Sequence, residues 1–174
     1  MTDPNIISNI TYRIADEGDA TLLLNMIKEL ARYEKLEHEV TATRADIEKT
    51  VFGKNAKAFA YIAESKAETG SQAPAGFALC FYNYSTFQGK SGIYIEDLYV
   101  RKAFRGKGIG KGFFRILARR ALEEDCGRLQ WWVLDWNKPS IQFYESLGAV
   151  QMDEWTVMRI EGTEKINALA RMTV

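Results

Sequence analysis

Apolar residues recur at helical spacing in two places within the first third of the chain. A strand-like run near residues 10–14 comes first, and either Asp16 or Asp19 can cap the helix that follows it. Thr43 and Asp46 then form a capping-box sequence before a second, shorter helix that stops at Gly53. The apolar faces of these two predicted helices consist of Leu23, Met26, Ile27, Leu30 and Tyr33, and of Ile47, Val51 and Phe52.

Three runs rich in aromatic and β-branched residues follow, and they predict strands at 58–64, 76–84 and 92–100. Together they resemble an antiparallel meander. The polar interval 65–74 contains Gly70 and Pro74, which indicates an exposed hairpin loop rather than a linker between domains. We therefore expect residues 1–174 to form a single domain.

The second half of the chain alternates helices and strands. The pattern predicts an amphipathic helix over 109–124, a buried strand over 129–136, and a helix that begins at Pro139 and stops at Gly148. A strand-like run over 150–160 and a weak helix from Glu164 complete the chain. The apolar face of the long helix is predicted to contain Ile109, Phe113, Ile116, Leu117 and Leu122. This order of elements predicts an α+β fold in which strand-to-helix crossovers require some parallel pairing.

Composition excludes some classes of partner. The chain has 174 residues, of which 47% are hydrophobic and 26% charged, as in an ordinary globular domain. Folding at this size buries roughly 70% of the unfolded surface without disulfides or a structural metal. Basic and acidic residues balance at 23 each, so no overall field attracts nucleic acid or an anionic membrane. A charged ligand must therefore be recognised locally.

The cysteines and the single histidine carry little candidate chemistry. Cys80 and Cys126 are far apart, so we expect reduced thiols in a cytoplasmic protein rather than a disulfide framework. No metal site is expected, because His38 is the only histidine and neither cysteine has a second one at ligand spacing. The longest apolar stretch, 75–82, is too short to span a bilayer, and the N-terminus lacks the pattern of a secretory signal.

A glycine-rich segment, Arg105-Gly106-Lys107-Gly108-Ile109-Gly110, lies between a predicted strand and the long helix. Glycine at every second position permits positive φ and close approach of a ligand to the backbone. The N–H groups of such a turn, together with the dipole of the following helix, suit a phosphate group. Charge alone would also fit a solvated helix face, but the glycines favour anion binding. The basic residues gathered here are Arg101, Lys102, Arg105, Lys107, Lys111, Arg115, Arg119 and Arg120.

Two common phosphate-binding motifs do not match this turn. A Walker A loop requires glycine at position 105 and serine or threonine at 112, where the chain has Arg105 and Gly112. A dinucleotide fingerprint requires its third glycine at position 111 or 113, where the chain has Lys111 and Phe113. The turn therefore predicts a phosphate ligand of another kind.

Two acids, Glu96 and Asp97, interrupt the apolar strand predicted over 92–100. Adjacent strand residues point to opposite faces, so the two carboxylates are expected to have different surroundings. A carboxylate buried without partners costs several kcal/mol, so each acid must meet water, donors or a cation, or have a raised pKa. Pairing with an arginine of a neighbouring element is the structural alternative to a catalytic role.

The glycine turn matches the pattern Arg/Gln-x-x-Gly-x-Gly/Ala of the GNAT superfamily of N-acetyltransferases. Its surroundings resemble the diamine (spermidine/spermine) N-acetyltransferase subfamily, and within it the thialysine N-epsilon-acetyltransferase branch. This resemblance implies the GNAT fold, a mixed but mostly antiparallel twisted sheet flanked by helices, and transfer of acetyl from acetyl-CoA to a primary amine. The segments that carry it are Leu30-Ala31-Arg32-Tyr33-Glu34-Lys35-Leu36, Tyr84-Ser85-Thr86-Phe87, Ile95-Glu96-Asp97-Leu98-Tyr99-Val100, Val133-Leu134-Asp135-Trp136-Asn137 and Phe143-Tyr144-Glu145-Ser146-Leu147-Gly148-Ala149.

The resemblance also implies the site residues. Glu96 matches the acid that deprotonates the substrate ammonium, directly or through water, and Tyr144 matches the acid that protonates the departing thiolate. An alkyl ammonium with a pKa near 10.4 must lose its proton before it can attack a thioester. The implied acetyl-CoA contacts are Leu98, Tyr99, Val100, Arg105, Gly106, Lys107, Gly108, Ile109, Gly110 and Lys111, with Asn137, Lys138, Pro139 and Ser140. The implied substrate contacts are Tyr33, Glu34, Glu96, Gln130, Trp131, Trp132 and Glu154.

The acceptor amine stays open at this point. Polyamine-acetylating members carry an aspartate and a tryptophan where this chain has Ser85 and Phe87, so a carboxylate for a distant second ammonium is missing. A small thialysine-like or lysine-like amine is therefore favoured over spermine. A homodimer is implied by the resemblance alone. The alternatives are a protein acetyltransferase that modifies lysine side chains or N-termini, and a silent acetyl-CoA-binding module.

Overall fold

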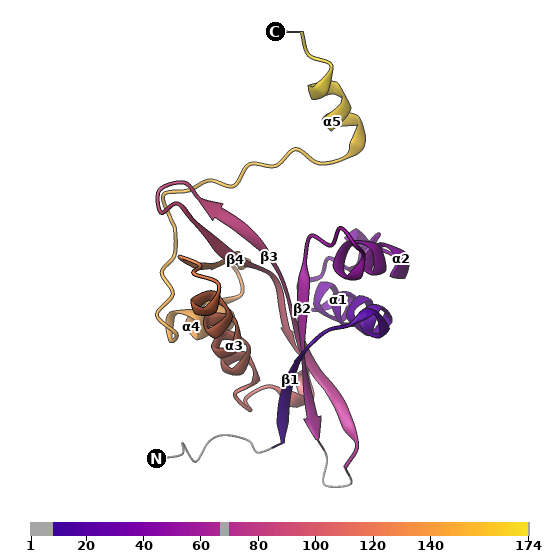
Figure 1. Ribbon diagram of the computed structural model, residues 1–174, viewed down its shortest axis with the longest axis vertical. Coiled ribbons are helices and arrows are strands. Elements are labelled where there is room, and N and C mark those ends of the chain that lie inside the picture. Colours follow the sequence, from indigo (N-terminus) through magenta and orange to yellow (C-terminus); the bar gives the residue numbers. More distant parts are fainter. Residues whose placement is uncertain (1–8, 67–69, 174) are drawn as a thin grey trace. The chain divides into compact units, whose positions relative to one another are not determined.

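The computed structural model describes residues 9–66 and 70–173 (Figure 1). The chain divides into two compact units, and the division falls between Trp132 and Val133 in the sequence. The first unit contains the sheet and the helices that cover it, and the second contains two short helices. In the described part of the chain, no helix is long and apolar enough to cross a membrane.

A five-stranded sheet in the order β1-β2-β3-β4-β5 forms the first unit. The first four strands pair antiparallel and β5 pairs parallel to β4, so the mixed, mostly antiparallel sheet is confirmed. The parallel pair is joined through a helix, as a crossover requires. The strands are β1 (Ile10–Ile14), β2 (Phe59–Lys66), β3 (Gln72–Ser85), β4 (Lys90–Val100) and β5 (Leu129–Trp131).

Two boundaries of the predicted strands are wrong. The hairpin loop predicted over 65–74 is shorter, because Ser65 and Lys66 pair with Ala73 and Gln72 in a polar extension of the β2–β3 ladder. A polar sequence does not exclude a strand whose side chains face solvent. The buried strand predicted over 129–136 is only three residues long and half-buried, and the tryptophan side chains at 132 and 136 are exposed.

Helices cover both faces of this sheet. α1 (Ala20–Glu34) and α2 (Arg44–Ile47) lie on one face, and α3 (Ile109–Glu123) lies on the other (Figure 1). The predicted capping box of Thr43 and Asp46 begins α2, which continues as a π-helical turn over Glu48–Phe52. Asp16 caps a 3₁₀ turn, Glu17–Asp19, that leads directly into α1.

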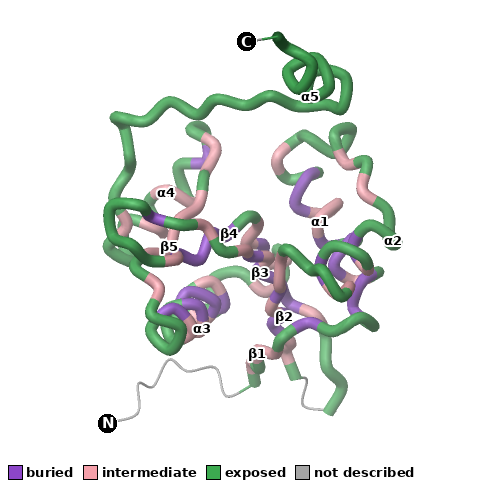
Figure 2. The backbone as a smooth tube through the Cα atoms, turned by 45° about the horizontal axis from the view of Figure 1, so that its top comes forward, coloured by how far each residue is buried: buried purple, intermediate pink, exposed green. Residues whose placement is uncertain are grey.

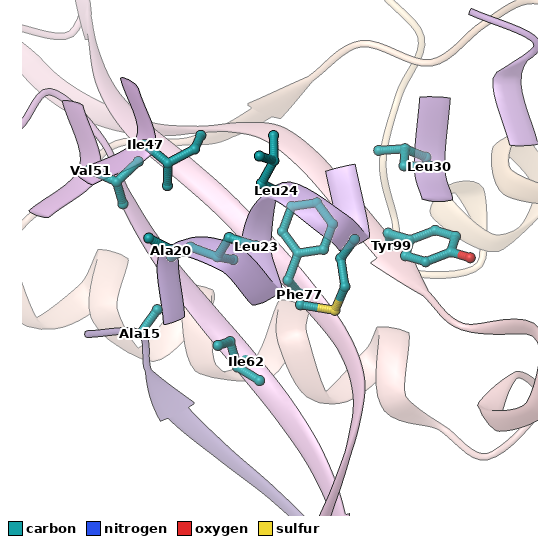
Figure 3. Packing of buried hydrophobic residues seen from close by; sticks show 12 residues of the cluster. Ala15, Ala20, Leu23, Leu24, Leu30, Ile47, Val51, Ile62, Phe77 and Tyr99 are labelled. Carbon is teal, nitrogen blue, oxygen red and sulfur yellow. The ribbon is translucent and has the colours of Figure 1, made fainter. Parts of the chain in front are cut away.

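The core lies between α1 and the sheet. Leu23, Met26 and Leu30 of α1 are buried as predicted and pack against Phe77 and Tyr99 of the central strands (Figure 3). On the opposite face, α3 buries Ile109, Phe113, Phe114, Leu117 and Ala121.

Leu122 was expected on the apolar face of α3 but is 82% exposed. At 100° per residue it lies far round the helix from Ile109 and Phe113, so apolar identity alone gave the wrong face.

The second unit contains α4 (Lys138–Glu145) and α5 (Thr163–Ala170). Pro139 stands in the first turn of α4, as predicted. No strand forms in the described residues between the two helices, so the strand predicted over 150–160 is wrong for this chain alone. Residues 150–173 are all exposed (Figure 2). A strand-like sequence forms a strand only where a second strand can pair with it.

Tyr12 of β1 fixes the first turn of α3. Its hydroxyl donates a hydrogen bond of 3.0 Å to the carbonyl oxygen of Ile109, and its ring packs edge-on against Phe113 with centroids 5.2 Å apart. A Cβ at Gly112 would overlap the Tyr12 hydroxyl and ring. Glycine at 112 therefore allows the close approach that holds the start of α3, and the turn before it, against the sheet.

Replacing Gly112 by alanine should lower the free energy of unfolding by about 1–3 kcal/mol through overpacking against Tyr12. This loss exceeds the gain of about 1 kcal/mol that alanine has over glycine in a helix. Urea denaturation of Gly112→Ala measures it, with Arg119→Ala on an exposed position of α3 as the control. In a Tyr12→Ala background the penalty should disappear. Equal stability of Gly112→Ala and the parent protein would contradict the contact.

Candidate active site

The glycine turn leaves open space beside its backbone. Gly106 and Gly108 both have φ of +75°, and no atom lies within 4 Å of the position that a Cβ would occupy at either residue. Gly108 is the N-cap of α3, and no side chain caps this helix. The first N–H groups of a helix have no partner within the helix. The turn therefore offers backbone donors and a positive helix end to an anion, as the sequence predicts.

The basic residues around the turn separate into two groups. In the described part of the chain, the exposed group forms no ion pair. Arg101 and Arg120 are instead engaged in contacts with other elements, so only part of the predicted basic cluster faces solvent. The exposed group comprises Lys102, Lys107, Lys111, Arg115 and Arg119, besides Arg105.

Arg105 folds back from the turn onto α1. Its Nε donates a hydrogen bond of 2.9 Å to the carbonyl oxygen of Val100. Its guanidinium carbon lies 4.8 Å from the ring centroid of Tyr33 and 5.8 Å from that of Tyr99. Stacking of this kind is attractive between a cation and an aromatic face. Arg105 therefore connects the turn to the C-terminal end of α1.

A second contact fixes the end of β4 to α1. Arg101 binds both carboxylate oxygens of Glu29, at 2.9 and 2.7 Å, and donates a third bond of 2.9 Å to the carbonyl oxygen of Pro74. Both charged side chains are 28% exposed. Bidentate pairs fix geometry as well as charge. The C-terminal ends of α1 and β4 are thus held side by side.

β4 and β5 pair over only three residues. Ile93–Ile95 pair with Leu129–Trp131, and no further pairing follows. Leu98, Tyr99 and Val100 pair with β3 on their other side. The β5-facing edge of this end of β4 therefore has no strand partner among the described residues. Backbone groups on such an edge are available to a ligand, as expected for the acetyl-CoA contacts at 98–100.

A β-bulge at Glu96 separates the two acids of β4. Asp97 pairs with Leu79 and Ile95 pairs with Cys80, so Glu96 has no partner in β3. Bulges change the direction of side chains and are frequent beside active sites. The Glu96 side chain is exposed, whereas Asp97 is partly buried. The different surroundings expected for the two acids are confirmed, although a bulge rather than regular alternation produces them.

Asp97 lies within electrostatic range of Glu34 and Glu96, and these three carboxylates form an acidic cluster. Burial raises the pKa of Asp97 to about 7, and the charges of Glu96 and Glu34 act in the same direction. Burial also raises the pKa of Glu34, the last residue of α1. No hydrogen bond or ion pair joins these three carboxylates to a basic side chain in residues 9–66 and 70–173. An arginine partner, the structural alternative for the β4 acids, is therefore not what the structure contains.

The implied substrate residues of β5 pack in different ways. Gln130 accepts a hydrogen bond of 2.9 Å from Asn83 Nδ2. The Trp131 ring packs edge-on against Phe114 at 4.9 Å, and Trp132, 55% exposed, packs edge-on against Tyr94 at 5.9 Å.

The remaining predicted residues lie in the second unit. Tyr144 is half-buried on α4, with its ring 5.4 Å from that of Phe143. Asn137 is buried, and its carbonyl oxygen accepts hydrogen bonds from the N–H groups of Ser140 and Ile141 at 3.0 and 3.1 Å. Lys138 and Pro139 form the first turn of α4, and Glu154 is exposed in the following segment.

A model described as the Acetyltransferase (GNAT) family matches residues 20–149, which include the glycine turn, the acids of β4 and Tyr144. The chain belongs to this family. Its fold and its enzyme class, N-acetyltransferase, are those that the sequence resemblance implies. Members of the family use acetyl-CoA as the acetyl donor.

Relatives share most of the chain. Thialysine N-epsilon-acetyltransferase of Sus scrofa is 36% identical over 162 residues, which cover 90% of this chain and 95% of the pig protein. L-ornithine N5-acetyltransferase of Arabidopsis thaliana is 40% identical over 100 residues, which cover 58% of this chain and 43% of that protein. A solved V. cholerae integron cassette protein is 27% identical with a TM-score of 0.74, covering 94% of this chain and 99% of its own.

Three features of this N-acetyltransferase were not predicted: the stacking of Arg105 on Tyr33, the Arg101–Glu29 pair and the bulge at Glu96. Each depends on contacts between segments far apart in sequence. The one local signal was the pair of acids within an apolar strand. In the described residues, no group of three or more histidine, cysteine or acidic side chains can hold a metal ion.

Replacing Gly108 by alanine should weaken acetyl-CoA binding about tenfold or more. A Cβ would fill the open side of the turn, and the left-handed backbone strains alanine by about 1–2 kcal/mol. Isothermal titration calorimetry with acetyl-CoA measures the change. Gly89→Ala is the matched control, since Gly89 has φ of +63° and equally open surroundings in the β3–β4 turn. Wild-type affinity in Gly108→Ala would contradict the donor site.

Proposed function

We propose that this N-acetyltransferase transfers acetyl from acetyl-CoA to the primary amine of a small cationic substrate of the thialysine or lysine type. The observation that carries the proposal is the acidic cluster of Glu34, Glu96 and Asp97, which has no basic partner in the described residues. Uncompensated carboxylates are costly when partly buried, as Glu34 and Asp97 are, so the cluster favours a cationic ligand. An alkyl ammonium supplies that charge.

The β3–β4 turn supports a short substrate. Ser85 is buried, and its Oγ accepts a hydrogen bond of 3.3 Å from the N–H of Gln88, so it serves the turn. Phe87 is 95% exposed. Neither residue offers a carboxylate to a second, distant ammonium. The names of the relatives, which act on thialysine and on L-ornithine, agree with an acceptor that has an amino-acid head.

The open turn and its exposed lysines fit the pyrophosphate of acetyl-CoA. Residues 105–111 would hold the pyrophosphate, and the free edge of Leu98, Tyr99 and Val100 would bind the arm. When bound, acetyl-CoA supplies the thioester carbonyl that the amine attacks. Residues 137–140, at the start of α4, are the second proposed contact.

The proposed reaction has two proton transfers, one from the substrate ammonium and one to the departing thiolate. Tyr33 and the acidic cluster bind the ammonium, and a carboxylate accepts its proton. Gln130, Trp131, Trp132 and Glu154 complete the proposed substrate contacts. Tyr144 donates a proton to the departing thiolate, an uphill transfer of about 1.5 pKa units or roughly 2 kcal/mol. The two units are proposed to act as a single domain, residues 1–174, because the family match runs across their boundary.

We also propose a homodimer. Nine large apolar side chains of residues 150–172, in the second unit, are more than half exposed. A stable interface buries about 800 Å² per partner, which an extended segment with this many apolar residues can provide. The free thiols Cys80 and Cys126 support a cytoplasmic location. The apolar residues are Val150, Met152, Trp155, Val157, Met158, Ile160, Ile166, Leu169 and Met172.

An amine panel tests the proposed function. Purified protein with acetyl-CoA should release CoA fastest with thialysine, lysine and ornithine, and more slowly with spermidine and spermine. Thiol release measured with a chromogenic disulfide reports the rate. Preference for lysine-containing peptides would indicate a protein acetyltransferase, and heat stabilisation by acetyl-CoA without turnover would indicate a silent binding module.

Within that panel, Tyr144→Phe serves as the test of the proton donor. Its kcat should fall by about 10²–10⁴, the usual contribution of general acid catalysis, while its affinity for acetyl-CoA stays unchanged. A large loss of acetyl-CoA affinity would contradict the assignment and show a structural role for the tyrosine.

The homodimer is tested by light scattering after size exclusion. The wild-type protein should have twice the chain mass of 19.8 kDa. Trp155→Asp with Val157→Asp should shift it to a monomer, because two charges would be buried in the interface. Leu122→Asp, an exposed apolar residue of the first unit, is the control and should stay dimeric. A stable dimer with a nanomolar Kd is almost fully assembled when the chain concentration is about 100 times that Kd. A wild-type protein that is monomeric at this concentration would overturn the proposal.

A further inference from the structure

Asp97 lies on the α1 side of the sheet. Its cross-strand neighbour Leu79 packs against the core that α1 covers, and so does Tyr99, two residues further along β4. Cross-strand neighbours share a face of the sheet. Asp97 therefore lies near the C-terminal end of α1, where Glu34 carries the last side chain of the helix.

The titratable groups that act on Asp97 from its own side of the sheet are acidic. Glu34 comes from α1 and Glu96 from β4 itself, whereas the buried thiol of Cys80, one residue after Leu79, lies on the other face of the sheet. The two nearby arginines are occupied elsewhere, Arg101 by Glu29 and Arg105 by the carbonyl oxygen of Val100. The negative end of the α1 dipole adds to this field. A positive charge and a proton are therefore both attracted to Asp97.

Glu96 has a different position. The bulge directs its side chain into solvent, where a proton acceptor is surrounded by water. Asp97 is partly withdrawn from water and has no basic partner in the described part of the chain. A base in such surroundings exchanges its proton near neutral pH, where a solvated carboxylate does not.

We propose that Asp97 is the catalytic base of the amine site and that Glu96 and Glu34 hold the ammonium and tune Asp97. This rests on the proposed function. The carboxylate of Asp97 removes one proton from the ammonium, which leaves a neutral amine and a carboxylic acid. The amine nitrogen then forms a bond to the thioester carbon as the carbon–sulfur bond breaks. The thiolate takes its proton from Tyr144, the second proton that the attacking nitrogen loses restores the tyrosine hydroxyl, and Asp97 returns its own proton to solvent.

The pH dependence follows from the pKa of Asp97, which burial and the acidic neighbours raise to about 7. Below this pH the folded protein holds Asp97 protonated and unable to accept a proton, so kcat/KM should rise as pH increases through about 7. Stability should change in the opposite direction. The pKa of Asp97 in the folded protein exceeds the usual value of 3.8. This difference stabilises the folded state fully below pH 3.8, and the stabilisation is lost as pH rises towards 7.

Asp97→Asn separates a base from a structural acid. With thialysine at pH 7.5, kcat/KM should fall about 10²–10⁴-fold. With canaline, whose aminooxy group is neutral at this pH, the loss should stay below about tenfold, because no proton must be removed before attack. The melting temperature of Asp97→Asn at pH 8 should be higher than that of the wild type. Asp125→Asn, which replaces an exposed acid paired with Lys90, is the control.

Glu96→Gln gives the opposing test. Removing its charge should move the acid limb of the wild-type pH profile to lower pH without abolishing it, whereas Asp97→Asn should abolish it. Equal losses with thialysine and canaline in Asp97→Asn, or an acid limb that only Glu96→Gln abolishes, would overturn the proposal while leaving the proposed function intact. Wild-type protein that acetylates no amine would overturn both.

Discussion

The short pairing between β4 and β5 is the constraint on which the site depends. Hydrogen bonding between the two strands stops after Ile95, and the bulge at Glu96 begins where it stops. From that point β4 is paired on one side only. A central strand has no free backbone groups to offer, whereas an edge does. The sheet therefore creates a free backbone edge inside the fold, next to the glycine turn that follows β4.

The acidic cluster of Glu34, Glu96 and Asp97 is held in place by its surroundings rather than by basic partners of its own. Arg101 and Arg105 tie α1 to β4 through Glu29, Tyr33 and a backbone carbonyl, and in doing so they are withheld from Glu34 and Asp97. The same two contacts hold the helix end over the strand. Rigid positioning and uncompensated charge thus come from one arrangement, which costs stability and is typical of functional sites.

Local patterns predicted the fold well, and long-range pairing explains the errors. α1, the capping box at Thr43 and the glycine turn each depend on residues close in sequence, and the structure confirms them. Leu122 was misplaced because apolar identity outweighed its angle on the helix. The strand over 150–160 has the composition of a strand but no partner in its unit. The burial of Asp97 depends on α1 and on a bulge, neither of which a strand pattern reveals.

The contrast between local sequence patterns and contacts between distant segments also applies to the proposed donor and acceptor sites. The proposed pyrophosphate site is a continuous turn and the start of one helix, so local sequence is sufficient to predict it. The proposed acceptor site combines the end of α1, the bulge of β4 and the turn at Ser85, which are distant in sequence. A substitution at Ser85 or Glu34 can change the charge offered to an amine without altering the backbone at Gly106 and Gly108. Members of one family can therefore keep a common donor while their acceptors diverge.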